Sequence, residues 1–212
     1  MMKNTITCLG LLPLLVAGLS YADISANLKV SGDIKPPTCS INNQNEVDIE
    51  YRFDIAPEMF PSSDILYLDG ETKRIEIVCD AATYLNFIAK DNRSDSVINP
   101  GDIFFGLGKY GVDNSQNIGV YTITMSNATV KGNSDEGAKK VSVLAAGGSA
   151  VPELLISQSK KTAWAETSTK LASGQIFAAD FEVKPMFYGE VKESAGDVSL
   201  DGSATLSFGF GI

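Results

Sequence analysis

The last stretch of the chain alternates apolar and polar residues with a strict period of two. From Val198 to Phe210, every even-numbered position is apolar or glycine, and every odd-numbered position is polar, acidic or glycine. The even-numbered set is Val198, Leu200, Gly202, Ala204, Leu206, Phe208 and Phe210. This pattern is typical of a β-strand with one face buried and the other in water. We therefore expect a long terminal strand whose apolar face needs a cover.

A second alternating segment lies near the start of the chain. Its apolar or small residues share one parity, and they are Ile24, Ala26, Leu28, Val30, Gly32 and Ile34. Polar residues occupy the positions between them. Pro36 and Pro37 end this pattern just before Cys39, because proline cannot donate a hydrogen bond to a sheet. The sequence thus predicts one-sided strands near both ends of the chain.

Residues 1–22 have the composition of a secretory signal peptide. A short basic start is followed by an apolar run from Ile6 to Leu19 and by the small-residue site Ser20-Tyr21-Ala22. A membrane anchor is the alternative, but the run is shorter than the ~18–20 apolar residues that span a bilayer and Pro13 interrupts it. We expect cleavage after Ala22 and a single domain over residues 23–212, with no membrane span in the mature chain.

Charge and composition exclude several function classes. The chain carries a net charge of −9 and no histidine, and removal of Lys3 with the signal peptide leaves −10. An acidic surface argues against nucleic acid and anionic membranes as partners. Without histidine, the Ser-His-Asp and Cys-His nucleophile systems and the common zinc sites are not available. We therefore predict a non-enzymatic protein with no cofactor, no metal and no catalytic residue.

Two cysteines remain after the signal peptide, Cys39 and Cys79. In an exported protein, a single pair of cysteines is typical of one structural disulfide. A redox or metal pair is the alternative. It lacks both the Cys-x-x-Cys spacing and a histidine partner, so the disulfide is favoured.

The middle of the chain consists of short apolar segments separated by turn residues. Expected strands cover residues 47–51, 72–79, 83–90, 103–107, 118–125, 128–131, 140–145, 154–156 and 175–188. Residues 80–82 are expected to form a hairpin or corner, and Pro185 to place the end of the last segment at an edge or bend. Residues 157–174 are ambiguous. The absence of helical periodicity favours an all-β sandwich.

Three groups of side chains carry possible chemistry, each with a plainer explanation. Paired carboxylates for acid–base work are more simply solvated charges. Oxygen ligands for Ca²⁺ in one loop are more simply turn residues. Aromatic residues for sugar stacking are more simply buried. These groups are, in turn, Asp64 with Asp69 and Glu71 with Glu76; Asp91, Asn92, Asp95 and Asn99; and Trp164, Tyr110 and Tyr121.

Several short segments, in this order and spacing, resemble a known family. They are Val30–Ile34 leading to Cys39, Val78-Cys79-Asp80, Asp91-Asn92-Arg93, Phe105–Gly108, Ile118–Tyr121, Leu200–Leu206 and the alternating terminus Gly196–Phe210. The chain resembles a chaperone–usher fimbrial subunit. It is most similar to a pilin-like family catalogued as a domain of unknown function.

The resemblance implies an immunoglobulin-like sandwich that lacks its last strand. In such pilins a hydrophobic groove lies between the first and last strands. A periplasmic pilus chaperone fills it first, and the N-terminal extension of the next subunit fills it later. The family's cysteines bridge the first two strands, which corresponds to Cys39 and Cys79. Its glycine, about a dozen residues before an aromatic, corresponds to Gly196 and Phe208. The family's penultimate tyrosine is replaced here by Phe210, third from the end.

Site residues follow from the same resemblance. The donated strand would present Ile24, Ala26, Leu28, Val30, Gly32 and Ile34. The groove would be bordered by Gly196, Val198, Leu200, Ala204, Leu206, Phe208 and Phe210. The expected function is a structural subunit of a fimbrium, exported through the periplasm to the surface of a Gram-negative bacterium, with an outer-membrane usher and neighbouring subunits as partners. The alternative is a sugar- or receptor-binding fimbrial adhesin or a periplasmic β-sandwich binding protein. A secreted β-sandwich hydrolase is disfavoured by the missing histidine.

Overall fold

The structure of the protein is a computed structural model that describes residues 25–32, 35–61, 65–194 and 198–211. The chain divides into two units, Met1–Ile34 and Lys35–Ile212. In the first unit, residues 25–32 form no strand or helix and are fully exposed to solvent. The expected signal peptide and the termini Ile24 and Ile34 of the expected donor strand lie outside the described residues. Among the described residues, no helix is long and apolar enough to cross a membrane.

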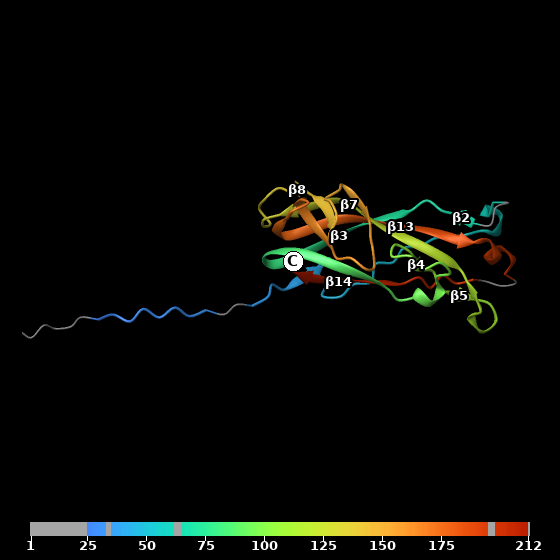
Figure 1. The fold of residues 1–212 in the computed structure, drawn as a ribbon, viewed down its shortest axis with the longest axis horizontal. Coiled ribbons are helices and arrows are strands. Elements are labelled where there is room, and N and C mark those ends of the chain that lie inside the picture. Colours follow the sequence, from blue (N-terminus) through green and yellow to red (C-terminus); the bar gives the residue numbers. More distant parts are fainter. Residues whose placement is uncertain (1–24, 33–34, 62–64, 195–197, 212) are drawn as a thin grey trace, which may run out of the picture. The chain divides into compact units, whose positions relative to one another are not determined.

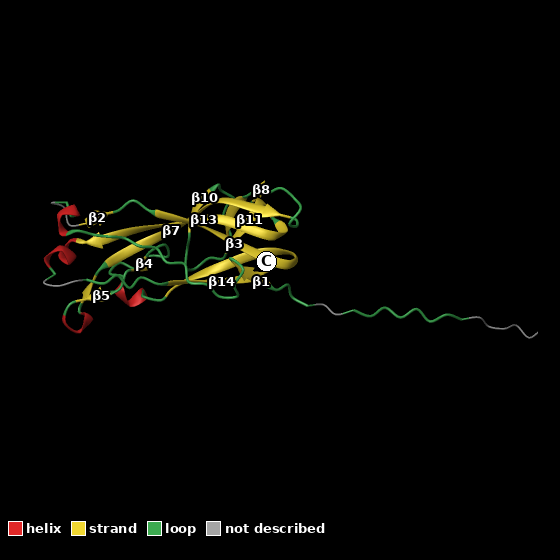
Figure 2. Cartoon of the chain, turned by 180° about the vertical axis from the view of Figure 1, so that it is seen from behind, coloured by secondary structure: helices red, strands yellow, loops and turns green. Residues whose placement is uncertain are grey.

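The second unit is an all-β fold (Figure 1). Its described strands are β1 (Cys39–Ile41), β2 (Ile65–Tyr67), β3 (Glu71–Asp91), β4 (Phe105–Gly106), β5 (Lys109–Tyr110), β6 (Gln116–Asn117), β7 (Gly119–Lys131), β8 (Lys139–Lys140), β9 (Ser142–Ala145), β10 (Glu153–Leu155), β11 (Thr162–Thr167), β12 (Lys170–Leu171), β13 (Ser173–Tyr188) and β14 (Ala204–Phe210). The helical elements are short 3-10 turns, as Figure 2 shows: η1 (Pro57–Met59), η2 (Ser94–Ser96), η3 (Val112–Asn114) and η4 (Gly189–Glu193). The all-β prediction is therefore confirmed.

One curled antiparallel sheet contains nearly all of these strands. Its order is β10-β7-β13-β3-β11-β12, with β1 and β14 also paired to β3. Strand β3 pairs with β1 and β13 through its first half and with β14 and β11 through its second half. The sheet therefore folds around β3 into a sandwich-like arrangement.

Residues 80–82 do not form the expected hairpin, whereas the expected corner is consistent with a register shift there: the β3–β13 ladder passes from Val78 opposite Ile176 to Thr83 opposite Gly174. Residues 71–91 form one continuous strand that runs through Asp80-Ala81-Ala82. That link contains no glycine or proline, and its two alanines are small enough to continue the strand while it changes partners. The strand is therefore long because it serves both halves of the sheet.

Other strand boundaries also differ from the sequence-based expectation. Strand β7 continues through residues 126–127, where a turn was expected, and Asn127 takes a φ of 48° at a register shift in the β7–β13 ladder. This is the geometry of a bulge, which needs a residue tolerant of positive φ. Pro185 does not lie at a sheet edge. On one side of β13, it lies between the ladder that β13 forms with β3 and the ladder that it forms with β2.

The hydrophobic core is centred on Phe87 in β3. Its ring lies 6.1 Å from that of Trp164, 5.9 Å from Phe181 and 5.4 Å from Phe208, measured between centroids. Trp164 is fully buried and donates from Nε1 to the carbonyl oxygen of Ala178 at 3.1 Å. Aromatic side chains from four strands thus meet at one point, and one of them belongs to the terminal strand β14.

A disulfide joins Cys39 in β1 to Cys79 in β3, as expected, and the two residues are direct partners in the ladder. It closes a loop with a sequence separation of 40. Such a loop restricts the unfolded chain and thereby stabilises the folded one.

Removing the disulfide is predicted to lower the free energy of unfolding by about 4 kcal/mol in the chain-entropy model. The test compares the wild type with a Cys39→Ala/Cys79→Ala variant by urea denaturation, with and without reductant. Reductant should bring the wild type to the stability of the variant and leave the variant unchanged. Equal stability of the two oxidised proteins would contradict this prediction.

Candidate functional site

One wall of the candidate site is an extended segment over residues 47–55. Its odd-numbered residues are half-buried and its even-numbered residues are exposed, which is the alternation of a strand. No backbone–backbone hydrogen bond joins residues 47–55 to any other described residue. The expected strand over 47–51 is therefore corrected: the segment is extended but has no ladder. It also continues further than predicted, through Phe53 and Ile55.

Side chains hold this segment on the sheet. The hydroxyl of Tyr51 donates to the carbonyl oxygen of Phe181 at 3.0 Å, and the Lys73 ammonium lies 5.3 Å from the centre of the Tyr51 ring. The backbone N–H of Arg52 donates to the Glu71 carboxylate at 2.8 Å. Burial, with a smaller contribution from the charge of Glu71, raises the pKa of Tyr51 to about 12. The hydroxyl therefore stays protonated and remains a donor at neutral pH.

These contacts also fix the direction of the segment's backbone groups. The N–H of Arg52 points to Glu71, and the carbonyl oxygen of Glu50 accepts from Lys73. The backbone N–H and C=O groups of the even-numbered residues therefore point toward β3. In an extended chain, successive residues point their backbone groups to opposite sides. The backbone groups of Ile49 and Phe53 therefore point away from β3 and have no partner among the described residues.

The other wall contains the terminal strand. Strand β14 covers residues 204–210, so the expected strand from Val198 to Phe210 is too long at its start. Within residues 198–203, the N–H of Asp201 donates to the carbonyl oxygen of Leu107, just after β4, at 3.1 Å, and the carbonyl oxygen of Ser203 accepts from the N–H of Asn92, just after β3, at 2.9 Å. Gly202 allows a close approach, because a Cβ there would lie 3.1 Å from the side chains of Leu107 and Tyr121.

The apolar side chains of this wall pack on the core but are only partly covered. The half-buried residues are Val198, Leu200, Ala204, Leu206 and Phe208. Phe210 departs from the predicted pattern: it has the parity of the buried face but is 41% exposed. It is the last residue of β14, where the strand ends. The alternation predicted for this segment is thus seen, with incomplete burial.

The free edge of β14 follows from its register. Among the described residues, strand β14 pairs with β3 alone, and the bonds from the N–H of Asn92 to Ser203 and from the N–H of Gly211 to Tyr84 lie at its two ends. Both bonds join directly opposed residues, so the odd-numbered residues between them also bond to β3. The backbone groups of the even-numbered residues Ala204, Leu206, Phe208 and Phe210 point away from β3. These N–H and C=O groups have no backbone partner among the described residues, so they form an open edge.

An ion pair positions the start of this wall. The guanidinium of Arg93 donates from Nε and Nη2 to the two carboxylate oxygens of Asp201, at 2.8 and 2.9 Å. These hydrogen bonds lower the pKa of Asp201 below its ordinary value. Asn92 adds bonds from its amide to the hydroxyls of Ser203 and Thr205. The loop after β3 therefore holds the approach to β14 on the side away from the open edge.

A groove lies between the two walls. It has a volume of about 680 Å³ and is lined from one wall by residues 50–55 and from the other by Val198 and Leu200. Phe60, Phe187 and Val191 also line it, together with the charged residues Glu50, Arg52, Asp54 and Lys192, so its surface is mixed. The structure thus contains a groove with apolar and charged lining residues, between an extended segment without a ladder and the residues that lead into β14.

The predicted site residues have different outcomes. Val198 and Leu200 line the groove, whereas Ala204, Leu206 and Phe208 pack half-buried against the core, and Gly196 lies outside the described residues. Of the expected donor strand, the described residues Ala26, Leu28, Val30 and Gly32 form no strand and are exposed. Sequence reasoning predicted residues 47–51 of the opposite wall as a strand but missed its continuation through Phe53 and Ile55. Its signal was present, because Tyr51, Phe53 and Ile55 alternate with Arg52 and Asp54 up to Pro57.

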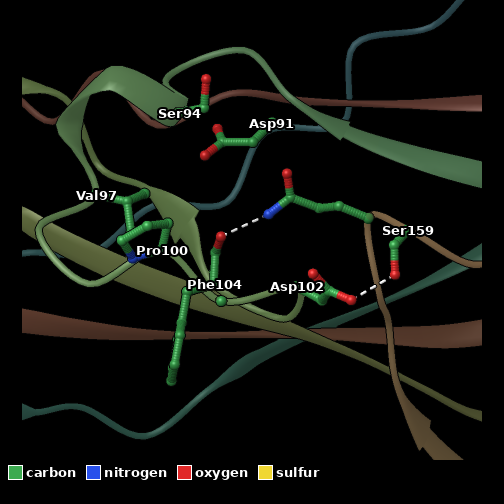
Figure 3. Close-up of a pocket in the computed structure, with 9 residues that line it drawn as sticks. Asp91, Ser94, Val97, Pro100, Asp102, Phe104 and Ser159 are labelled. Atoms are coloured by element: carbon green, nitrogen blue, oxygen red, sulfur yellow. Dashed lines mark hydrogen bonds between the residues drawn. The ribbon is translucent and has the colours of Figure 1, made fainter.

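A smaller pocket lies between the loop after β3 and the loop before β11 (Figure 3). Its volume is about 290 Å³, and Val97 and Pro100 lie on one side with Asp102 and Ser159 on the other. The two loops are tied together: Gln158 donates from Nε2 to the carbonyl oxygen of Phe104 at 2.7 Å, and the Ser159 hydroxyl bonds to the Asp102 carboxylate. The pocket is small, and both polar and apolar residues line it.

The possible Ca²⁺ ligands have other partners. Asp91 accepts hydrogen bonds from the N–H groups of Arg93 and Gly106, and Asp95 pairs with Lys109 at 2.8 Å. Asn92 bonds to the terminal segment. No group of three or more His, Cys, Asp or Glu side chains suited to a metal ion occurs in the described residues. The explanation of these residues as loop-forming side chains fits best.

The other two possible sites are also not assembled. Trp164, Tyr110 and Tyr121 are buried, so they form no exposed platform for a sugar. Glu71 is occupied by Lys73 and by the N–H of Arg52, which lower its pKa. Asp64 lies outside the described residues.

Comparison with models of known protein families finds no match, and comparison with curated proteins finds none either. The functional interpretation of the groove therefore depends on its geometry alone.

Amide exchange tests the open edge directly. In the isolated chain we predict slow exchange for the N–H groups of Thr205, Ser207 and Gly209, and fast exchange for Leu206 and Phe208, although the latter two side chains are more buried. The reason is that only the odd-numbered amides bond to β3. The measurement is residue-resolved NMR exchange. Equal protection at odd and even positions would show that this edge of β14 is already paired.

Proposed function

We propose that the protein is an exported structural subunit of a chaperone–usher fimbria, in which a strand from another protein completes the groove. One observation carries the proposal: β14 has half-buried apolar side chains, and the backbone groups along one of its edges have no partner among the described residues. Unpaired strand edges beside apolar surface favour the addition of a strand from another chain. The proposed fold is accordingly an immunoglobulin-like sandwich of the pilin type that lacks one strand.

The donated strand in this proposal comes from the N-terminal segment. Leu28 and Val30 are 95% and 97% exposed, which is an unfavourable state for two large aliphatic side chains on one parity. Burying both in a groove would contribute roughly 3–6 kcal/mol, as an upper bound. Ala26 and Gly32 share that parity and are small, so the backbone can approach the groove closely.

The proposed partners follow the route of such a subunit. A periplasmic pilus chaperone would fill the groove first, an outer-membrane usher would receive the complex, and neighbouring fimbrial subunits would replace the chaperone. The protein would act at the cell surface and catalyse no reaction. Residues 1–22 would direct export and be removed.

Two changes test the donor role. Deletion of residues 23–31, or the single substitution Val30→Asp, is predicted to abolish joining of subunits while chaperone binding persists, because only the donated strand is lost. A matched control is Val112→Asp, since Val112 is 83% exposed in η3, away from the groove. Joining is measured as multimers on gels of unheated samples, and chaperone binding by co-purification. Normal multimers from the deletion variant would refute the donor role.

The groove itself is tested from the other side. Leu206→Asp places a charge on the half-buried face beside the open edge, and should abolish both chaperone binding and multimer formation. Ser207→Asp, one residue along on the exposed face, should preserve both. A Leu206→Asp protein that still binds its chaperone would contradict the proposed groove.

A second candidate function is sugar binding. The observation in its favour is the small pocket, in which two aspartates, a glutamine and two serines surround a partly apolar space. A glycan array with the folded mature chain tests it. Binding that is lost on Gln158→Ala would favour this function, and an array without any signal would exclude it for the glycans present.

A further inference from the structure

We propose that residues 47–55 form a strap that opens while the rest of the sheet stays folded, and that the open strap is the preferred site of an arginine-specific protease, between Arg52 and Phe53. The strap is the extended wall of the groove described above. Such a cut depends only on contacts within residues 35–194, so it needs neither a partner subunit nor the proposed function.

The backbone of the strap contributes little to holding it in place. No backbone–backbone hydrogen bond joins residues 47–55 to any other described residue, and none of these residues is fully buried. Segments with few buried contacts and no ladder open at a lower free energy than paired strands. Strand β3, in contrast, pairs with β13 and β1 in the same region of the fold. The strap can therefore open without unfolding the sheet.

Both ends of the strap are anchored, so the part that opens is bounded. Before the strap, Ile41 and Gln44 exchange backbone hydrogen bonds at 2.7 and 2.8 Å. After it, the carbonyl oxygen of Ala56 accepts from the N–H of Met59 at 3.0 Å, which closes the turn of η1. Opening therefore breaks only the contacts that residues 47–55 make themselves.

A charged pair on β3 makes most of the polar contacts that hold the strap. Glu71 and Lys73 lie 3.1 Å apart. Glu71 accepts from the N–H of Arg52, while Lys73 donates to the carbonyl oxygen of Glu50 and lies over the ring of Tyr51. The Tyr51 hydroxyl adds one bond to β13. Glu71 and Lys73 are both partly exposed, so water can replace these contacts at low cost.

An arginine-specific protease meets three sites in different surroundings, because the arginines of the chain are Arg52, Arg74 and Arg93. Arg74 lies inside the ladder of β3 with β13, directly opposite Asp180. The guanidinium of Arg93 is held by both carboxylate oxygens of Asp201. The Arg52 side chain is 79% exposed, and its extended segment has backbone groups free to pair with another protein. Arg52 is therefore the site that the fold protects least.

The cut would leave the two pieces of the chain joined. Hydrolysis adds one water molecule across the peptide bond and leaves a carboxylate on Arg52 and an ammonium group on Phe53. Cys39 lies before the cut and Cys79 after it, and the disulfide connects them. Cleavage would therefore break one wall of the groove without releasing the N-terminal piece.

Limited digestion of the purified protein, with its disulfide intact, tests the proposal. We expect the bond after Arg52 to be cut at least about tenfold faster than those after Arg74 and Arg93, because the latter need larger openings. The product should run as one band on a non-reducing gel and as two bands after reduction, and mass spectrometry identifies the site. A first cut at Arg74 or Arg93 would overturn the proposal. So would cleavage at Arg52 that occurs only at urea concentrations that unfold the whole protein.

Variants of the charged pair show whether opening of the strap limits the cut. Glu71→Ala removes the acceptor for the N–H of Arg52, and Lys73→Met removes the ammonium group but keeps an apolar stem. Each should speed cleavage at Arg52 about threefold to tenfold, while cleavage at Arg74 stays slow. The control is Glu76→Ala, which removes an equal charge from the opposite, exposed face of β3 and should leave the rate unchanged.

Two results with these variants would contradict the strap. Rates at Arg52 that equal the wild-type rate in both Glu71→Ala and Lys73→Met would show that the charged pair does not hold the segment closed. A parallel rise at Arg74 would show that the variants loosen the whole sheet, so that the segment does not open on its own.

Discussion

Strand β3 is the element on which the rest of the fold depends. It bonds to β1 and β13 along its first half and to β14 and β11 along its second half, and it supplies Phe87 to the centre of the core. The disulfide ties β1 to it as well. In the part of the chain that the structure describes, strand β14 has no ladder partner other than β3. The terminal strand is therefore well anchored on one side, and its opposite edge is left unpaired.

The groove results from that one-sided anchoring together with a wall that has no ladder. Residues 47–55 are held by the Tyr51 hydroxyl on β13 and by Lys73 and Glu71 of β3, and each of these contacts involves a side chain and forms no backbone ladder. A strand inserted beside β14 would satisfy its open backbone groups and cover Leu206 and Phe208 at once. Filling the groove thus adds hydrogen bonds and apolar burial together, which is the physical basis of the proposed assembly.

Period-two alternation predicted the all-β class and the inward residues of the terminal strand, because the side-chain period of a strand is independent of its partners. The cysteine count predicted the disulfide. Pairing could not be predicted in the same way: the continuity of β3 through Ala81 and Ala82, and the loss of strand at residues 198–203, depend on contacts distant in sequence. Residues 47–51 were predicted to be extended, but the continuation through Phe53 and Ile55 was not, because the prolines at 57 and 61 are typical of a loop.

The central claim is that another chain occupies the groove, and amide exchange in the assembled form tests it most directly. Isotope-labelled chain is compared before and after it forms multimers, at Leu206 and Phe208 on the open edge and at Thr205 and Ser207 on the β3 side. The account predicts that the two even-numbered amides change from fast to slow exchange while the odd-numbered pair stays slow. Even-numbered amides that remain fast in the multimer would contradict it, because the edge would then be unpaired after assembly.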